Sequence, residues 1–297
     1  MLMDASTNTE ASIVAREGFR LSAQQERVWT QTAEAGLGFW AECEVLLEGA
    51  LDVARLKESF RQVVRRHEIL RTIFQRQPGL KVAFQVILDE PEAECVWQDV
   101  DLRALPQPVR RERIRELVAQ QQAAVNLGHG PVLTVLLARL ESGSWFLVFS
   151  LPALCADLRS LRNLIDEAGR GYAGLERGGT GEVLQYVDVA QWQEELLTGE
   201  DTRAGRDFWR AYCRNLDFDA GNFILSSFEI GSEAVFAPSM VVQEVEASLV
   251  SKVAAASSGL DASEADVLLT CWGLFLARIT GRPMITIGCE SDGRKYQ

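Results

Sequence analysis

The stretch from Trp145 to Ser160 constrains the fold more than any other part of the sequence. Trp145 to Phe149 is a nearly unbroken apolar run, typical of a strand that is buried on both faces. The run breaks at Pro152, and apolar side chains then recur at helical spacing. These are Leu158, Leu161, Leu164, Ile165, Ala168 and Tyr172. We therefore predict a buried strand, a tight connection and a helix, and we expect reactive groups at the connection.

Composition limits the classes of function. A chain of 297 residues that is 47% apolar can bury a large core, as one large or two medium domains. A formal charge of -12 argues against binding nucleic acid or an anionic membrane. No apolar run is long enough to cross a bilayer, and the polar N-terminus does not resemble a targeting signal, so we expect a cytoplasmic protein with no membrane partner.

The six cysteines have neither disulfide nor zinc spacing, which predicts no disulfide framework and no metal site. Most are expected to be small core residues. The four arginines between positions 110 and 115 alternate with glutamates, as on a solvated helix face.

Helix and strand patterns alternate irregularly, which predicts a mixed α/β fold with hairpins. We expect a flexible arm at 1–18, a first lobe at 19–176, and linker helices with an incomplete second lobe at 177–297. Six glycines between 169 and 181 mark the boundary. Strands are predicted at 41–47, 82–88, 94–100, 132–140, 144–149, 223–230, 240–245 and 284–287, and the helix that begins at Asp52 is predicted to end within 65–74 and pass straight into a strand. Helices are predicted from Ser22 and Asp52, and at 108–125, 158–172, 183–197, 202–216 and 267–279.

The order of these landmarks resembles the condensation domain of nonribosomal peptide synthetases. The segment from Arg66 to Phe74 matches the family's second motif at essentially every defining position, and it is the most specific signal. Leu21 to Trp29 looks like the opening motif, and Asn126 to Pro131 occupies the place of a family loop. Later segments that are similar include 192–197 with 207–209, and 276–281 with 287–288 and Arg294. The resemblance covers about residues 20 to 297.

The resemblance implies two lobes related to chloramphenicol acetyltransferase, facing each other across a tunnel. Carrier proteins would enter from either side with substrates on their phosphopantetheine arms, so carrier proteins and adjacent synthetase domains are the expected partners. No tightly bound cofactor is expected. The family's chemistry is attack of an acceptor amine on a donor acyl thioester.

Two departures from the family are visible in the sequence. Active members carry His-His-x-x-x-Asp-Gly at the strand–helix connection, whereas alignment on Asp157 places Pro152 and Ala153 at the histidine positions and Leu158 at the glycine. A methyl group cannot accept a proton, so a general-base contribution of about 100- to 10,000-fold is unavailable from Ala153. The chain also stops after the first expected strand of the second lobe, which predicts an exposed sheet edge.

The remaining candidate residues each have a structural interpretation beside a functional one. Asp157 is expected to be structural, paired with Arg71 or Arg294, or to cap the following helix. Cys155 is the one possible nucleophile at the connection, but buried filler is favoured because no histidine is nearby. Ser150 and Cys155 are expected to line the tunnel. In the family, Arg66 and His67 belong to a structural motif, and His129 is expected to be a solvated loop residue.

The sequence leaves three hypotheses for the function open. The first is a condensation-like domain of a peptide or hybrid peptide-polyketide synthetase that is an interaction platform for carrier proteins and does not form amides by the usual route. Alternatively, the domain retains acyl transfer by positioning alone, or catalyses another carrier-bound step such as dehydration or ester formation. The third hypothesis is a stand-alone acyltransferase relative that uses CoA thioesters.

Overall fold

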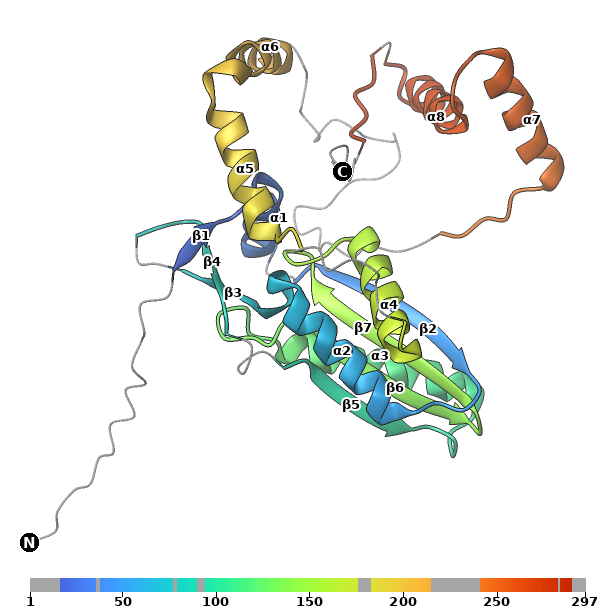
Figure 1. Cartoon of the computed structure of the whole chain (residues 1–297). Helices are drawn as coiled ribbons and strands as arrows, with labels where there is room; N and C mark the ends of the chain where they lie inside the picture. The colour runs from blue at the N-terminus through green and yellow to red at the C-terminus, as the bar shows by residue number, and fades with distance from the viewer. Residues whose placement is uncertain are drawn as a thin grey trace, which may run out of the picture. The chain divides into compact units, whose positions relative to one another are not determined.

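The computed structural model describes residues 17–35, 38–76, 79–89, 94–175, 183–214, 241–282 and 284–289 (Figure 1). The chain divides into two compact units, Met1–Thr202 and Arg203–Gln297. The predicted N-terminal arm lies outside the described residues except for its last two positions. The first unit extends past position 176, where the sequence placed the end of the first lobe, and it includes a further helix.

The first unit contains two sheets. A four-stranded sheet has the order β2-β7-β6-β5, in which only the β5–β6 pair is parallel. A smaller antiparallel sheet has the order β1-β4-β3. The strands are β1 (Gly18–Arg20), β2 (Trp40–Glu48), β3 (Thr72–Gln75), β4 (Phe84–Ile87), β5 (Val96–Asp101), β6 (Thr134–Glu141) and β7 (Ser144–Pro152).

Helices cover both faces of the larger sheet. In Figure 1, α2 and α4 lie on one face and α3 lies on the other. The helices of this unit are α1 (Ala23–Ala35), α2 (Val53–Arg66), α3 (Gln107–Ala124), α4 (Leu158–Ala173) and α5 (Tyr186–Thr198), with short 3-10 turns η1 (Glu68–Arg71) and η3 (Glu200–Thr202).

Alternate residues of the central strands enter two separate cores, as a strand's period of two requires. Leu147 and Phe149 pack with Phe60 of α2 and Leu161 of α4, whereas Val148 packs toward α3. The prediction that this strand is buried on both faces is confirmed. It extends further than predicted, because Pro152 still pairs with Trp40 of β2.

Several helix ends are capped, among them the predicted cap at Asp52. The Asp52 side chain accepts a hydrogen bond from the Arg55 amide at 3.0 Å, and Ser263 and Asp266 form a reciprocal capping box. Gly174 ends α4 with a φ of 71°, a left-handed conformation that glycine adopts without strain.

The second unit is helical in its described part. It contains α6 (Arg203–Arg214), α7 (Ala247–Gly259) and α8 (Glu264–Thr280). Helix α7 was not predicted. The predicted strands at 241–245 and 284–287 are wrong, because both segments lack regular structure. A lone extended segment gains no ladder hydrogen bonds, and no described segment pairs with either one. The predicted strand at 223–230 lies outside the described residues.

Candidate functional site

The connection between β7 and α4 is a tight turn fixed by its backbone. The Ala153 amide donates to the Phe39 carbonyl at 2.8 Å, and the Cys155 amide donates to the Pro152 carbonyl at 2.8 Å. Proline is tolerated at the end of the strand because its missing N–H costs least where the ladder stops. Ala153 therefore sits immediately after the last paired residue of β7, and it presents only a methyl group there.

Cys155 is a member of the core that α2 and α4 share with the sheet. Burial raises the pKa of its thiol well above the ordinary value. A nucleophilic cysteine needs the opposite shift, because the thiolate is the reactive form. The structure thus favours the packing role for this side chain over a role as nucleophile.

Asp157 caps α4. Its carboxylate accepts hydrogen bonds from the Ser160 amide at 2.7 Å and the Ser160 hydroxyl at 2.6 Å. Arg71, one of its two predicted partners, donates to the Leu88 carbonyl at 2.6 Å and lies 3.3 Å from a Glu68 carboxylate oxygen. Arg294, the other, lies outside the described residues. An arginine partner for Asp157 stays a prediction.

The Arg66–His67 motif ties helices together on the α4 side of the sheet. Glu167 of α4 lies 3.2 Å from Arg66 Nε and 2.8 Å from His67 Nε2. Gln185, just before α5, donates to the Arg66 carbonyl at 3.1 Å and accepts from the Glu68 amide at 3.0 Å. Sequence reasoning missed Glu167 and Gln185, which are about a hundred residues away along the chain.

Ser150 occupies the opposite face of the sheet and is only 1% exposed. Its hydroxyl lies 2.8 Å from the Thr134 hydroxyl and accepts from Gln122 Nε2 at 3.3 Å. Gln122, on α3, also donates to the Glu42 carboxylate at 3.0 Å. A polar network therefore runs from β6 through β7 and α3 to β2.

Glu42 is the one carboxylate of this polar network, and its pKa is raised. Desolvation by the surrounding protein is the main cause, the Gln122 hydrogen bond opposes it, and the neighbouring Glu44 charge adds to it. Sequence reasoning missed both Glu42 and Gln122. Trp40, Glu42 and Glu44 are alternate residues of β2 and so share one face of the sheet. This alternation could have indicated that the face that carries Ser150 has polar groups at its β2 edge.

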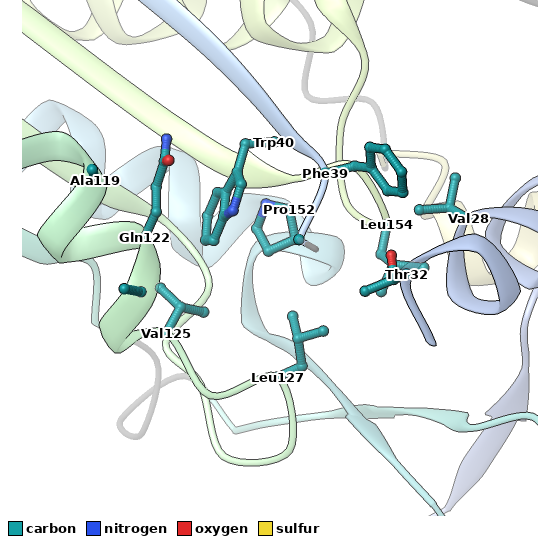
Figure 2. A pocket seen from close by; sticks show the side chains of 12 residues that line it. Val28, Thr32, Phe39, Trp40, Ala119, Gln122, Val125, Leu127, Pro152 and Leu154 are labelled. Carbon is teal, nitrogen blue, oxygen red and sulfur yellow. The ribbon is translucent and has the colours of Figure 1, made fainter. Parts of the chain in front are cut away.

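A pocket of about 420 Å³ opens beside this network (Figure 2). Its walls come from α1, the start of β2, the end of α3, the following loop, and the β7–α4 connection. The lining is mainly apolar, as in most small-molecule sites. The lining residues are Val28, Thr32, Gly38, Phe39, Trp40, Ala119, Gln122, Ala123, Val125, Leu127, Pro152 and Leu154.

Metal-binding and membrane-spanning features are both absent from the described ranges. Those ranges contain no group of three or more His, Cys, Asp or Glu side chains placed to hold a metal ion. Within the same ranges, no helix combines the length and apolar character needed to cross a bilayer.

Comparison with known proteins places the chain in a family. A family model described as "Condensation domain" matches residues 16–297, so the chain belongs to the condensation-domain family. A linear gramicidin synthase of Brevibacillus parabrevis is 31% identical over 290 residues, which are 93% of this chain and 6% of that protein. The chain thus spans a small fraction of that relative's length.

Two solved structures are similar in fold. The condensation domain of the Monacolin K polyketide synthase MokA has a TM-score of 0.71 at 19% identity, covering 89% of this chain and 60% of that one. The EpoB cyclization-docking bidomain of Sorangium cellulosum has a TM-score of 0.55 at 26% identity, covering 68% and 40%. The predicted family resemblance and the mixed α/β, chloramphenicol acetyltransferase-like fold are confirmed.

Proposed function

We propose that this condensation-family chain binds carrier proteins and neighbouring synthetase domains without forming amides by the family's histidine route. The observation that carries the proposal is Ala153, which occupies the position of the second family histidine when the sequence is aligned on Asp157. The substrates would arrive on phosphopantetheine arms of carrier proteins, as the relationship to peptide synthases suggests.

The groups around Ala153 support the proposal because none of those described is poised as a replacement base. The Cys155 thiol has a raised pKa and stays protonated at neutral pH. Asp157 directs a carboxylate oxygen at the Ser160 amide and hydroxyl. The chain has two histidines. His67 is held by Glu167, and His129 lies in the loop before β6.

A second candidate function is another carrier-bound step. The observation that favours it is the 26% identity to the EpoB cyclization-docking bidomain. Such chemistry would rely on positioning of the reactants, which can supply much of a barrier reduction without a histidine. Its product would differ from a simple amide by the loss of water.

The test uses the full chain with an acyl-loaded donor carrier and an aminoacyl-loaded acceptor carrier, followed by intact-protein mass spectrometry of both carriers. In amide formation the amine nitrogen bonds to the thioester carbonyl carbon, the C–S bond breaks, and the donor carrier regains its free thiol. We expect no amide above the protein-free background, together with saturable carrier binding. Amide formed rapidly by wild type and retained in Cys155→Ala and Asp157→Asn would overturn the proposal.

A variant with a histidine at position 153 tests directly whether the missing imidazole accounts for the absence of amide formation. Ala153→His returns an imidazole to the family position, and we expect amide formation to rise toward the ~100-fold contribution typical of a general base. Ala173→His, at the exposed end of α4, is the matched control and should leave the rate at background.

The same assays distinguish the other candidate functions. A product lighter by one water would favour the second candidate. Calorimetric binding of CoA without binding of a carrier protein would favour a CoA-dependent acyltransferase.

A further inference from the structure

The pocket beside the β7–α4 connection contains two polar groups that have no hydrogen-bond partner among the described residues. Trp40 lines the pocket, and its indole N–H has no hydrogen-bond partner among the described residues. The indole ring lies between Gln122 and Pro152 in Figure 2. A donor at the wall of an apolar pocket fixes the orientation of a ligand that brings an acceptor.

Gly38 keeps the space in front of this indole nitrogen open. A Cβ atom at position 38 would lie 3.0 Å from Trp40 Nε1, which is too close for ordinary packing. A side chain at position 38 would therefore crowd the indole N–H from this direction. An alanine at position 38 would place its Cβ against the indole nitrogen and so obstruct the donor.

Gln122, which also lines the pocket, contains an acceptor. Its amide nitrogen donates to Glu42 at 3.0 Å and to Ser150 at 3.3 Å, which uses both of its hydrogens. Its carbonyl oxygen has no partner in the part of the chain that the structure describes. The Glu42 and Ser150 contacts hold the amide in one orientation, so this acceptor is preorganised.

Charge limits the ligand further. Glu42 adjoins Gln122, and Glu44 follows on the same face of β2. Two carboxylates at this edge disfavour an anionic ligand, whereas a neutral molecule is not repelled. The remaining lining is aliphatic and aromatic, including Val28, Phe39 and Leu127.

We propose that this pocket binds a neutral apolar molecule carrying a secondary amide, whose carbonyl oxygen accepts from Trp40 Nε1–H and whose N–H donates to the Gln122 side-chain oxygen. A secondary amide carries one acceptor and one donor, and it therefore matches both unused groups. The inference concerns binding and does not depend on whether the chain transfers acyl groups.

The experiment measures binding of three probes to the full chain by calorimetry and by saturation-transfer NMR. N-butylbenzamide carries the carbonyl and the N–H, butyl benzoate lacks the N–H, and 5-phenylpentanoate is an anion. We expect the amide to bind about fivefold more tightly than the ester, the effect of roughly one hydrogen bond of ~1 kcal/mol. The anion is expected to bind more weakly than the amide.

Two variants locate the site. Gly38→Ala should weaken amide binding about fivefold by obstructing the indole donor. Ala123→Phe places a ring in the pocket from an exposed position of α3 and should abolish saturable binding. Ala173→Phe, on α4 at the other face of the sheet, is the matched control and should bind as wild type does.

The inference fails if N-butylbenzamide does not bind at millimolar concentration, or if Ala123→Phe binds it as wild type does while keeping the wild-type circular dichroism spectrum. Equal affinity for the amide and the ester would overturn the assignment of the ligand class. Each result is independent of the carrier assay, because a chain that forms amides rapidly could still bind or reject these probes.

Discussion

Helices α2 and α8 are both rich in large apolar side chains, yet their surroundings differ. In α2, Phe60 is 2% exposed and packs edge-on against Trp97 and Phe149, with ring centroids 5.6 and 5.7 Å apart. In α8, Trp272 is 53% exposed and Phe275 is 52% exposed. The first unit provides a four-stranded sheet against which α2 packs, whereas the second unit contains no strand among its described residues.

This difference shows that an apolar pattern along a helix predicts the helix but not the surface that covers it. Apolar burial contributes about 25 cal/mol per Å² of surface removed from water. That contribution is realised for α2 and is absent for most of the apolar surface of α8. Exposed apolar patches of this kind mark places where a further surface can pack.

The largest expected effect is the contrast between one aromatic side chain of each helix. Phe60→Ala should lower the free energy of unfolding of the first unit by about 3–5 kcal/mol, because it leaves a cavity between α2 and the sheet. Trp272→Ala should change the free energy of unfolding of the second unit by less than about 0.5 kcal/mol, as substitutions of exposed residues usually do. Urea denaturation followed by circular dichroism measures both. A larger loss for Trp272→Ala than for Phe60→Ala would break the comparison between the two units.

The helix caps should give smaller effects of different kinds. Asp52→Ala and Ser263→Ala each remove one N-cap hydrogen bond, typically ~1 kcal/mol. Because α2 is packed into the core, Asp52→Ala should lower the stability of the whole first unit. Ser263→Ala should reduce amide protection in α8 alone. Hydrogen exchange read by mass spectrometry distinguishes the two, and Asp52→Asn and Ser263→Thr are the controls that retain a cap. A loss of protection throughout the chain for Ser263→Ala would contradict the prediction.

The smallest expected effect is the pH dependence that Glu42 contributes. Because the pKa of Glu42 is raised in the folded state, that state binds its proton more tightly than the unfolded chain does. The ionised Glu42 carboxylate therefore lowers the free energy of unfolding at pH values above the ordinary carboxyl pKa. This loss disappears as the pH falls below that pKa. Glu42→Gln should be more stable than wild type at pH 7, by at most about 0.5 kcal/mol at this partly solvated position.

Thermal denaturation of both proteins between pH 3.5 and pH 7 tests the sign, with the two curves converging at the acidic end. Glu48→Gln, at the end of the same strand, serves as the matched control because it removes a carboxylate that does not contact Gln122. A stability difference that grows as the pH falls would contradict the prediction.

Local patterns predicted much of the first unit. The β6–β7 hairpin, the stripe of α2 and the Asp52 cap follow from periodicity and cap chemistry over a few residues, and each is confirmed. The contacts that organise the site were not predicted in the same way. Glu167 contacts His67, which is 100 residues away in the sequence, and Gln122 donates a hydrogen bond to Glu42, which is 80 residues away. Such pairs depend on how helices pack on the sheet, which no short pattern specifies.

Strand formation also depends on long-range contacts that a short sequence pattern does not specify. The segments at 241–245 and 284–287 have the composition of strands but are not strands, because a strand is stabilised by a neighbour that supplies its hydrogen bonds. The sequence predicted the local preference correctly for β2 and β7, where partners are present, and incorrectly for these segments.

The sequence by itself determined the family resemblance, the presence of a bare methyl side chain at Ala153, and the turn between β7 and α4. These features are local, and a single side chain or a short run of residues decides them. Only the tertiary structure decided that Ser150 is buried in a polar network, that Cys155 belongs to the core, and that Trp40 and Gln122 line one pocket. Those outcomes depend on which face of a strand meets which helix, and that is fixed when the sheet and its covering helices pack together.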